Sequence, residues 1–223
     1  MNVLIIGDSH SYFLNSFDGI KYPDIMNIKH HWMGPSLCKS LTCDKTTLNT
    51  RTRILKILKN EDFKSDVIIF SFGEIDCRFH IAGRLNRKKD IFLDEDMKKS
   101  IKITALRYVS FLYEINLMGY NVISWAPIGT NTRVIQTDPA NPSYGTIPQR
   151  NKVNEFFTEE LIKYSNPDIK IFSILKYLID ENYNTRNEFY ADNMHLNDTD
   201  PNKDLIWKFV LPLFIEYKKE KNL

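Results

Sequence analysis

The sequence contains few cysteines, and no two of them form a CxxC motif. Its 223 residues include only Cys38, Cys43 and Cys77. An odd number without a CxxC pair argues against a disulfide framework and against a zinc knuckle. We therefore expect a protein that stays in a reducing compartment.

Long hydrophobic runs are also missing. The first apolar run, Val3–Ile6, is too short for a signal-peptide core or a membrane span, and no basic residue precedes it. Neither sign of charge is in excess, because 30 basic residues face 28 acidic ones and leave a net charge of +2. This balance gives no electrostatic case for nucleic acid or a membrane as a partner. We expect a cytoplasmic protein of unknown oligomeric state.

Several signature motifs are absent. There is no GxxxxGK[ST] phosphate loop, no G-x-S-x-G elbow and no HExxH metal motif. With a single glycine, Gly7, after the first apolar run, a nucleotide- or phosphate-binding fold is disfavoured. No linker rich in Gly, Ser or Pro divides the chain, and 43% of its residues are hydrophobic. One domain spanning residues 1–223 is therefore expected.

Short apolar runs alternate with helical patterns along the chain. The pattern predicts an α/β fold in which helices cover both faces of a sheet of about five parallel strands. The predicted strands are Asn2–Ile6, Ile25–His30, Val67–Phe72, Asn121–Ala126 and Ile169–Ile174. The predicted helices are Thr46–Leu58, Met97–Met118, Pro148–Tyr164 and a last helix that begins at Asp200-Pro201.

Polar residues follow the predicted strands, at the sheet edge where sites form in such folds. Ser9 comes just after the first strand, and a serine there is either a nucleophile or a helix cap. Asp192 and His195 precede the last helix. They suit a carboxylate that orients a general base, or a turn whose Asp bonds its own backbone and whose His is exposed. If the first interpretation is correct, Ser9 Oγ and His195 Nε2 lie within hydrogen-bond reach.

Taken together, these motifs resemble the SGNH, or GDSL-type, esterase and acyltransferase superfamily. Gly7-Asp8-Ser9 matches the first block and Asp192-x-x-His195 the last, with Gly34 and Gly73 as the glycines of the second and third blocks. The segment from Gly145-Thr146 to Arg150-Asn151, with Asn154 beyond, is similar to the start of the penultimate helix in bacterial glycan-associated members.

The resemblance implies a flavodoxin-like three-layer αβα sandwich and a catalytic triad of Ser9, Asp192 and His195. The oxyanion hole would use the backbone N–H groups of Ser9 and Gly34, beside Gly73 of the third block. No cofactor and no resident metal are implied.

The chain departs from the family at Ile75, where the third block normally supplies an Asn side chain to the oxyanion hole. Arg78 is the predicted replacement donor, held by Glu74 and Asp76, and its alternative is an ion pair with one of these carboxylates. His80 is either a substrate contact or a surface residue. Other possible substrate or oxyanion contacts are Asp8 and His10, and a divalent ion held by Asp8, His10, Asp76 and His80 is the less favoured interpretation.

The resemblance therefore implies ester chemistry, with a small acyl group such as acetyl on a carbohydrate or glycan. The same triad would serve an O-acyltransferase, and the missing Asn leaves open a non-catalytic binding domain of the same fold. Trp32 and Trp125 lie near strand ends, where each either stacks on a sugar ring or packs in the core.

Overall fold

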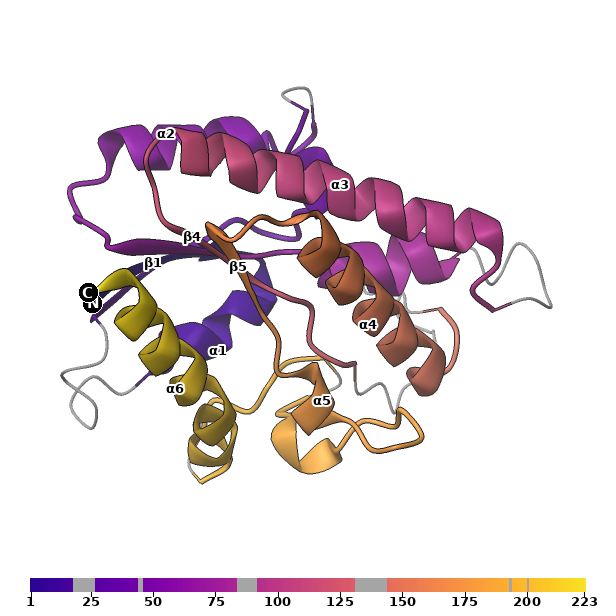
Figure 1. The fold of residues 1–223 in the computed structure, drawn as a ribbon. Helices are drawn as coiled ribbons and strands as arrows, with labels where there is room; N and C mark the ends of the chain where they lie inside the picture. Colours follow the sequence, from indigo (N-terminus) through magenta and orange to yellow (C-terminus); the bar gives the residue numbers. More distant parts are fainter. Residues whose placement is uncertain (18–26, 44–45, 84–91, 131–143, 193, 200) are drawn as a thin grey trace.

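A five-stranded, all-parallel sheet with the strand order β2-β1-β3-β4-β5 forms the centre of the molecule (Figure 1). The structure is a computed structural model that describes residues 1–17, 27–43, 46–83, 92–130, 144–192, 194–199 and 201–223. The strands are β1 (Asn2–Gly7), β2 (Asn27–Trp32), β3 (Val67–Ser71), β4 (Val122–Trp125) and β5 (Ile169–Phe172). The predicted α/β fold with five parallel strands is confirmed.

The second strand differs most from its prediction. It runs through His31 and Trp32, whereas the predicted strand ended at His30; Ile25 and Met26 lie outside the described residues. Two histidines and a tryptophan give no apolar run, because β2 is an edge strand whose side chains are only half-buried or exposed.

Helices cover both faces of the sheet (Figure 1). One layer contains α2 (Thr50–Asn60), α3 (Glu95–Leu117) and α4 (Ile147–Tyr164), and the other contains α1 (Tyr12–Asn15) and α6 (Asn202–Lys221). The shorter elements are α5 (Leu175–Leu178), a π-helix (Asp76–Ile81) and 3-10 turns at Ser9–Ser11, Cys38–Ser40 and Asn187–Phe189. The helix predicted over 46–58 begins later, at Thr50.

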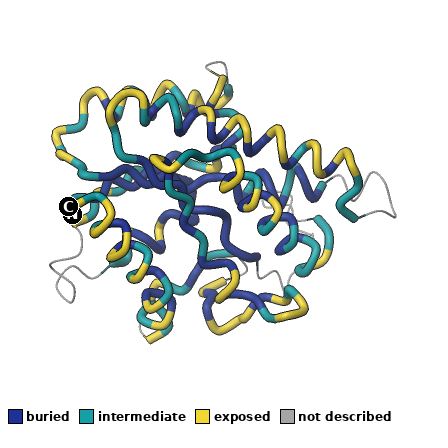
Figure 2. Tube along the Cα trace, in the orientation of Figure 1, coloured by how far each residue is buried: buried dark blue, intermediate teal, exposed yellow. Residues whose placement is uncertain are grey.

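Side chains of β1 alternate between two hydrophobic cores. Leu4 and Ile6 pack with the layer of α2, α3 and α4, whereas Val3 and Ile5 pack with α1 and α6. This alternation follows from the two-residue period of a strand, and burial on both faces explains the continuous apolar run. The buried residues concentrate in the sheet, and the helices expose their outer sides (Figure 2).

The strand register brings three loops together at the carboxyl edge of the sheet. Gly7, the last residue of β1, pairs with Trp32 of β2 and with Ser71 of β3. A Cβ atom on Gly7 would lie 2.7 Å from the Ser71 carbonyl oxygen, so only glycine permits this close approach. The loops that carry Gly34 and Gly73 consequently flank the turn that carries Ser9.

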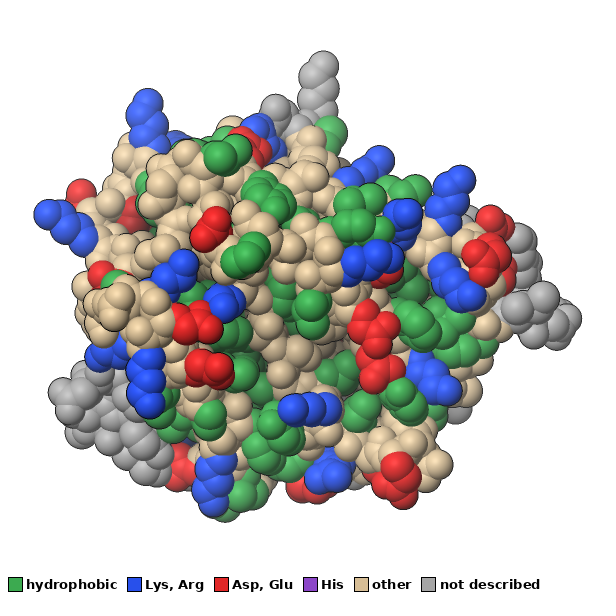
Figure 3. Space-filling model, in the orientation of Figure 1, with side chains coloured by type: hydrophobic (Ala, Val, Ile, Leu, Met, Phe, Trp, Pro, Cys, Tyr) green, Lys and Arg blue, Asp and Glu red, His purple; other side chains and the backbone are tan. Residues whose placement is uncertain are grey.

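The surface carries charges of both signs. On the face shown in Figure 3, Lys and Arg side chains are interspersed with Asp and Glu side chains and with hydrophobic ones. Within the described ranges, no helix is both long enough and apolar enough to cross a membrane.

Candidate active site

Ser9 lies in a 3-10 turn directly after β1. The turn is capped by Asp8, whose Oδ1 accepts a hydrogen bond of 2.9 Å from the His10 backbone N–H. Ser11 Oγ donates to the Asp8 carbonyl oxygen at 2.6 Å, which closes the turn. Because Asp8 supplies the cap, the hydroxyl of Ser9 is left for another partner.

That partner is His195, which is 186 residues further along the chain. Ser9 Oγ lies 2.9 Å from His195 Nε2, and His195 Nδ1 lies 2.7 Å from Asp192 Oδ2. The expectation that Ser9 and His195 lie within hydrogen-bond reach is confirmed. With the proton on Nδ1, the ring donates to the carboxylate and presents Nε2 as an acceptor for the serine hydroxyl, which is the arrangement that a general base requires.

Asp192 bonds nearby backbone, as the alternative interpretation expected, but His195 is half-buried and bonded to Ser9 and is not exposed. Asp192 Oδ1 accepts from the backbone N–H groups of Met194 and His195, each at 2.7 Å, while Oδ2 holds the imidazole. Burial alone would raise the pKa of Asp192, but these hydrogen bonds hold it below its ordinary value, so the carboxylate is ionised at neutral pH. Tyr190 anchors the turn by donating to the Gly129 carbonyl oxygen at 2.6 Å.

A buried chain of charged groups lies beside the serine. Glu74 accepts a 3.0 Å hydrogen bond from His10 Nε2 through Oε2, and a 2.7 Å bond from Arg78 Nε through Oε1. The His10 ring in turn lies against His195, with ring centroids 5.1 Å apart. Apart from Asp192, the nearest group of this series to the candidate base is therefore His10, and Glu74 links His10 to Arg78.

These contacts set the charge states of Glu74 and His10. Burial alone would raise the pKa of Glu74, but the positive charges of His10 and Arg78 lower it to about 2. Burial alone would lower the pKa of His10, but the charge of Glu74 and its hydrogen bond to the ring raise it above its ordinary value. We therefore treat Glu74 as an ionised carboxylate bridging two cations. The predicted ion pair between Arg78 and Glu74 is observed.

Asp76 has a different partner from the one expected. Its Oδ2 accepts a 2.8 Å hydrogen bond from the Cys38 backbone N–H, which ties the π-helix to the segment that follows β2. Burial raises the pKa of Asp76 to about 6. The expectation that Asp76 helps to hold Arg78 is wrong in this respect, because the fold presents a backbone donor from another loop to it.

Gly34 and Gly73 lie on either side of the Ser9 turn, as the motifs predict. Both have positive φ angles, 78° and 110°, so the loops bend there in a way that favours glycine. A Cβ on Gly73 would lie 2.8 Å from the Phe157 ring. Ile75, at the position where the family has Asn, is half-buried and carries no polar group.

His80 lies in the π-helix, half-buried, with its ring 4.7 Å from that of Phe79. Burial lowers its pKa. The metal interpretation of Asp8, His10, Asp76 and His80 gains no support: the described part of the chain contains no group of three or more His, Cys, Asp or Glu side chains that could hold a metal ion.

The start of α4 supports the loop that follows β4. Arg150 Nε donates to Thr130 Oγ1 at 2.9 Å, Asn151 Oδ1 accepts from the Thr130 N–H at 3.1 Å, and Asn154 Nδ2 donates to the Ile128 carbonyl at 2.8 Å. The side chains of Arg150, Asn151 and Asn154 are all buried. The sequence motif identified these residues, but only the structure shows that they position a loop.

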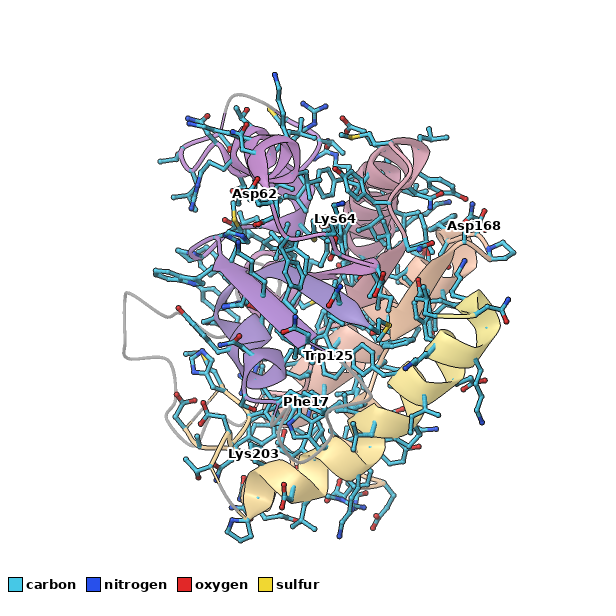
Figure 4. The ribbon with its side chains drawn as sticks, turned by 90° about the vertical axis from the view of Figure 1, so that its left-hand side faces the viewer. Phe17, Asp62, Lys64, Trp125, Asp168 and Lys203 are labelled. Carbon is cyan, nitrogen blue, oxygen red and sulfur yellow. The ribbon has the colours of Figure 1, made fainter. Side chains whose placement is uncertain are left out.

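The two candidate stacking tryptophans differ sharply. Trp125 is only 2% exposed and packs between the sheet and the layer of α1 and α6 (Figure 4), so it cannot meet a ligand. Trp32 is 53% exposed. The sequence could not separate the two, because both end a strand and only the layer of helices over each strand decides exposure.

No protein-family profile matches the chain, and no curated protein is significantly similar to it in sequence. Solved structures do share its fold. A GDSL-like lipase from Bacteroides thetaiotaomicron superposes with a TM-score of 0.59 at 10% identity, covering 97% of this chain and 88% of that one. A lipase from a goat rumen metagenome gives 0.57 at 15% identity, covering 95% and 98%.

A carbohydrate acetylesterase family member from Sinorhizobium meliloti gives a TM-score of 0.55 at 13% identity, covering 100% of this chain and 99% of that one. The chain thus has the three-layer α/β fold of GDSL-type hydrolases along nearly its whole length. The resemblance drawn from the sequence motifs is confirmed at the level of the fold.

Proposed function

We propose that the protein is a serine-dependent esterase of the GDSL type that works through an acyl-enzyme. The observation that carries this proposal is the hydrogen-bonded series from Ser9 Oγ through His195 to Asp192. It lies at the carboxyl edge of a parallel sheet, where sites of this fold class form. No sequence motif alone supports the proposal as strongly, because the three side chains meet only in the folded chain.

The mechanism follows from this geometry. Ser9 Oγ attacks the ester carbonyl carbon while its proton passes to His195 Nε2, and Asp192 holds the ring and offsets its new positive charge. The oxyanion faces the backbone N–H groups of Ser9 and Gly34 beside Gly73. His195 then gives the proton to the departing alcohol oxygen. Water, or a second hydroxyl, enters by the same route in reverse and releases the acyl group from Ser9.

The substrate we propose is a small acyl ester, such as an acetate, carried on a carbohydrate. The similarity in fold to a carbohydrate acetylesterase family member supports this choice. Transfer of the acyl group to another sugar hydroxyl instead of water uses the same residues. Comparing acetate release with the formation of a new acetyl sugar ester distinguishes the two reactions.

A fluorophosphonate probe that labels activated serines tests the proposal. We expect the wild-type protein to be labelled. Ser9→Ala and His195→Ala should each abolish labelling and lower the rate of ester turnover by several orders of magnitude. The double variant should be little worse than either single one, because the two residues act in one step. Asp192→Asn should cost less than loss of Ser9. Absence of labelling in the folded wild-type protein would favour a non-catalytic binding domain.

A further inference from the structure

Two exposed aromatic side chains lie next to the Ser9 turn. Trp32 is 53% exposed and Tyr12 is 44% exposed, although both have large apolar rings. Their ring centroids are 6.2 Å apart and their planes are inclined by 35°. The His30 ring lies 5.0 Å from that of Tyr12. The three side chains form one continuous surface, which we call the aromatic platform.

The platform belongs to the same edge of the sheet as Ser9. Trp32 ends β2 and pairs with Gly7, two residues before Ser9. His30 and Trp32 point to the face that α1 covers, because alternate side chains of a strand share a face. Tyr12 begins α1, directly after the Ser9–Ser11 turn.

A hydrogen bond fixes the platform to that turn. Ser11 Oγ already donates to the Asp8 carbonyl oxygen, so His30 Nε2–H donates to Ser11 Oγ at 2.7 Å. The position of the aromatic rings is therefore coupled to the backbone that carries the nucleophile. A ligand lying on the rings would occupy the edge of the sheet that carries the Ser9 turn.

The chemistry of the platform suits a sugar ring. Covering an exposed aromatic face with a ligand removes apolar surface from water, which is favourable. The other two tryptophans, Trp125 and Trp207, are each only 2% exposed and do not offer such a face. A pyranose presents flat C–H faces to aromatic rings while its hydroxyls stay in water or reach polar neighbours such as His30. A long acyl chain instead needs an aliphatic groove that encloses it.

We propose that Tyr12 and Trp32 form a subsite that binds the sugar ring of the ester while its acyl group lies at Ser9. This inference rests on the proposed esterase function, because it places the acyl group of a substrate at Ser9. Its test, however, measures binding and not turnover, so that the two can fail separately.

The exposure of the three tryptophans provides the assay. In Ser9→Ala protein, which cannot turn over substrate, acrylamide quenches mainly the fluorescence of Trp32 because Trp125 and Trp207 are buried. Acetylated oligosaccharides of glucose, xylose and N-acetylglucosamine are titrated as probes. We expect at least one to change the fluorescence saturably and to protect it from acrylamide, and the response to disappear in Trp32→Phe.

Calorimetry supplies the second measurement. Trp32→Ala and Tyr12→Ala should each weaken binding of that sugar by about tenfold, the scale of a lost aromatic contact. Phe156→Ala is the matched control, because Phe156 is an exposed aromatic residue of α4, in the layer opposite α1, and the variant should bind as tightly as the parent.

Four outcomes are decisive. Saturable sugar binding that needs Trp32 supports the subsite. If Ser9 is labelled by the fluorophosphonate but no sugar protects Trp32, the subsite is wrong and the esterase proposal stands. If short-chain fatty acids or lipid micelles protect Trp32 and sugars do not, the platform holds the acyl side of the substrate and the inference is overturned. Sugar binding without labelling of Ser9 would instead remove the esterase proposal.

Discussion

Asp8, the residue before the candidate nucleophile, is ionisable and almost completely buried, and this has a measurable consequence. Its side chain is only 1% exposed. Oδ1 accepts from the His10 N–H, but Oδ2 has no hydrogen-bond partner in the described residues. Burial raises the pKa of Asp8 from 3.8 to about 7, although the charge of His10 acts in the opposite direction.

The sign of the effect follows from proton binding. Between about pH 4 and pH 7 the folded chain keeps a proton on Asp8 that the unfolded chain has released. The free energy of unfolding therefore falls as pH rises through this interval, by about 1.4 kcal/mol for each pH unit and about 4 kcal/mol in total from this one group.

Asp8→Asn removes this dependence while keeping the shape of the side chain and the acceptor for His10. The new amide N–H groups are buried without a partner, which costs about 1–3 kcal/mol at every pH. We therefore expect the wild-type protein to be the more stable at pH 4.5 and the variant to be the more stable at pH 8, with the two curves crossing in between.

Urea unfolding followed by circular dichroism from pH 4.5 to 8 measures both curves. Glu74, Asp76 and His10 are present in both proteins, so the difference between the two curves reports the titration of Asp8. Asp198→Asn, which changes an exposed carboxylate, serves as the control and should follow the wild-type slope. Parallel curves for wild type and Asp8→Asn would refute the reasoning, because Asp8 would then be ionised equally in the folded and unfolded chains.

Two further predictions concern the surroundings of Ser9. Gly7→Ala places a Cβ 2.7 Å from the Ser71 carbonyl oxygen, so it should cost at least about 1–3 kcal/mol of stability and lower the rate of Ser9 labelling. Gly34→Ala has open space around it and is strained only by its φ of +78°, so it should cost only about 1–2 kcal/mol. Urea unfolding measures both losses, and a larger loss for Gly34→Ala would contradict the prediction. Arg78→Ala leaves the buried Glu74 without one of its cations and should cost about 3–5 kcal/mol, with Arg78→Lys intermediate because lysine lacks the planar fork. If both variants retain stability and their kcat/KM falls less than about threefold, Arg78 has no part in the site.

Local features of the site were predictable from the sequence because they depend on neighbouring residues. The continuous apolar run of β1 predicts a strand that is covered on both faces, and the structure buries it on both. The Asp192–His195 turn closes on itself, since Asp192 bonds the backbone and ring of a residue three positions away. The positions of Gly7, Gly34 and Gly73 follow from the same strand ends.

Contacts between distant segments were decided only by the tertiary structure. Glu74 binds His10, which is 64 residues away, as well as Arg78, and Asp76 binds Cys38, whereas the sequence favoured Arg78 as the partner of both carboxylates. The preference of a carboxylate for a cation is general, and the particular donor that reaches it depends on which loops the sheet order makes adjacent.

Exposure was likewise decided by the fold. Trp32 and Trp125 both end a strand, so the sequence treats them alike. Trp125 ends β4 inside the sheet, where the helices of one layer cover it, whereas Trp32 ends the edge strand β2 and stays 53% exposed. A strand's place in the sheet is fixed by the packing of every other strand and helix, and no local pattern encodes it.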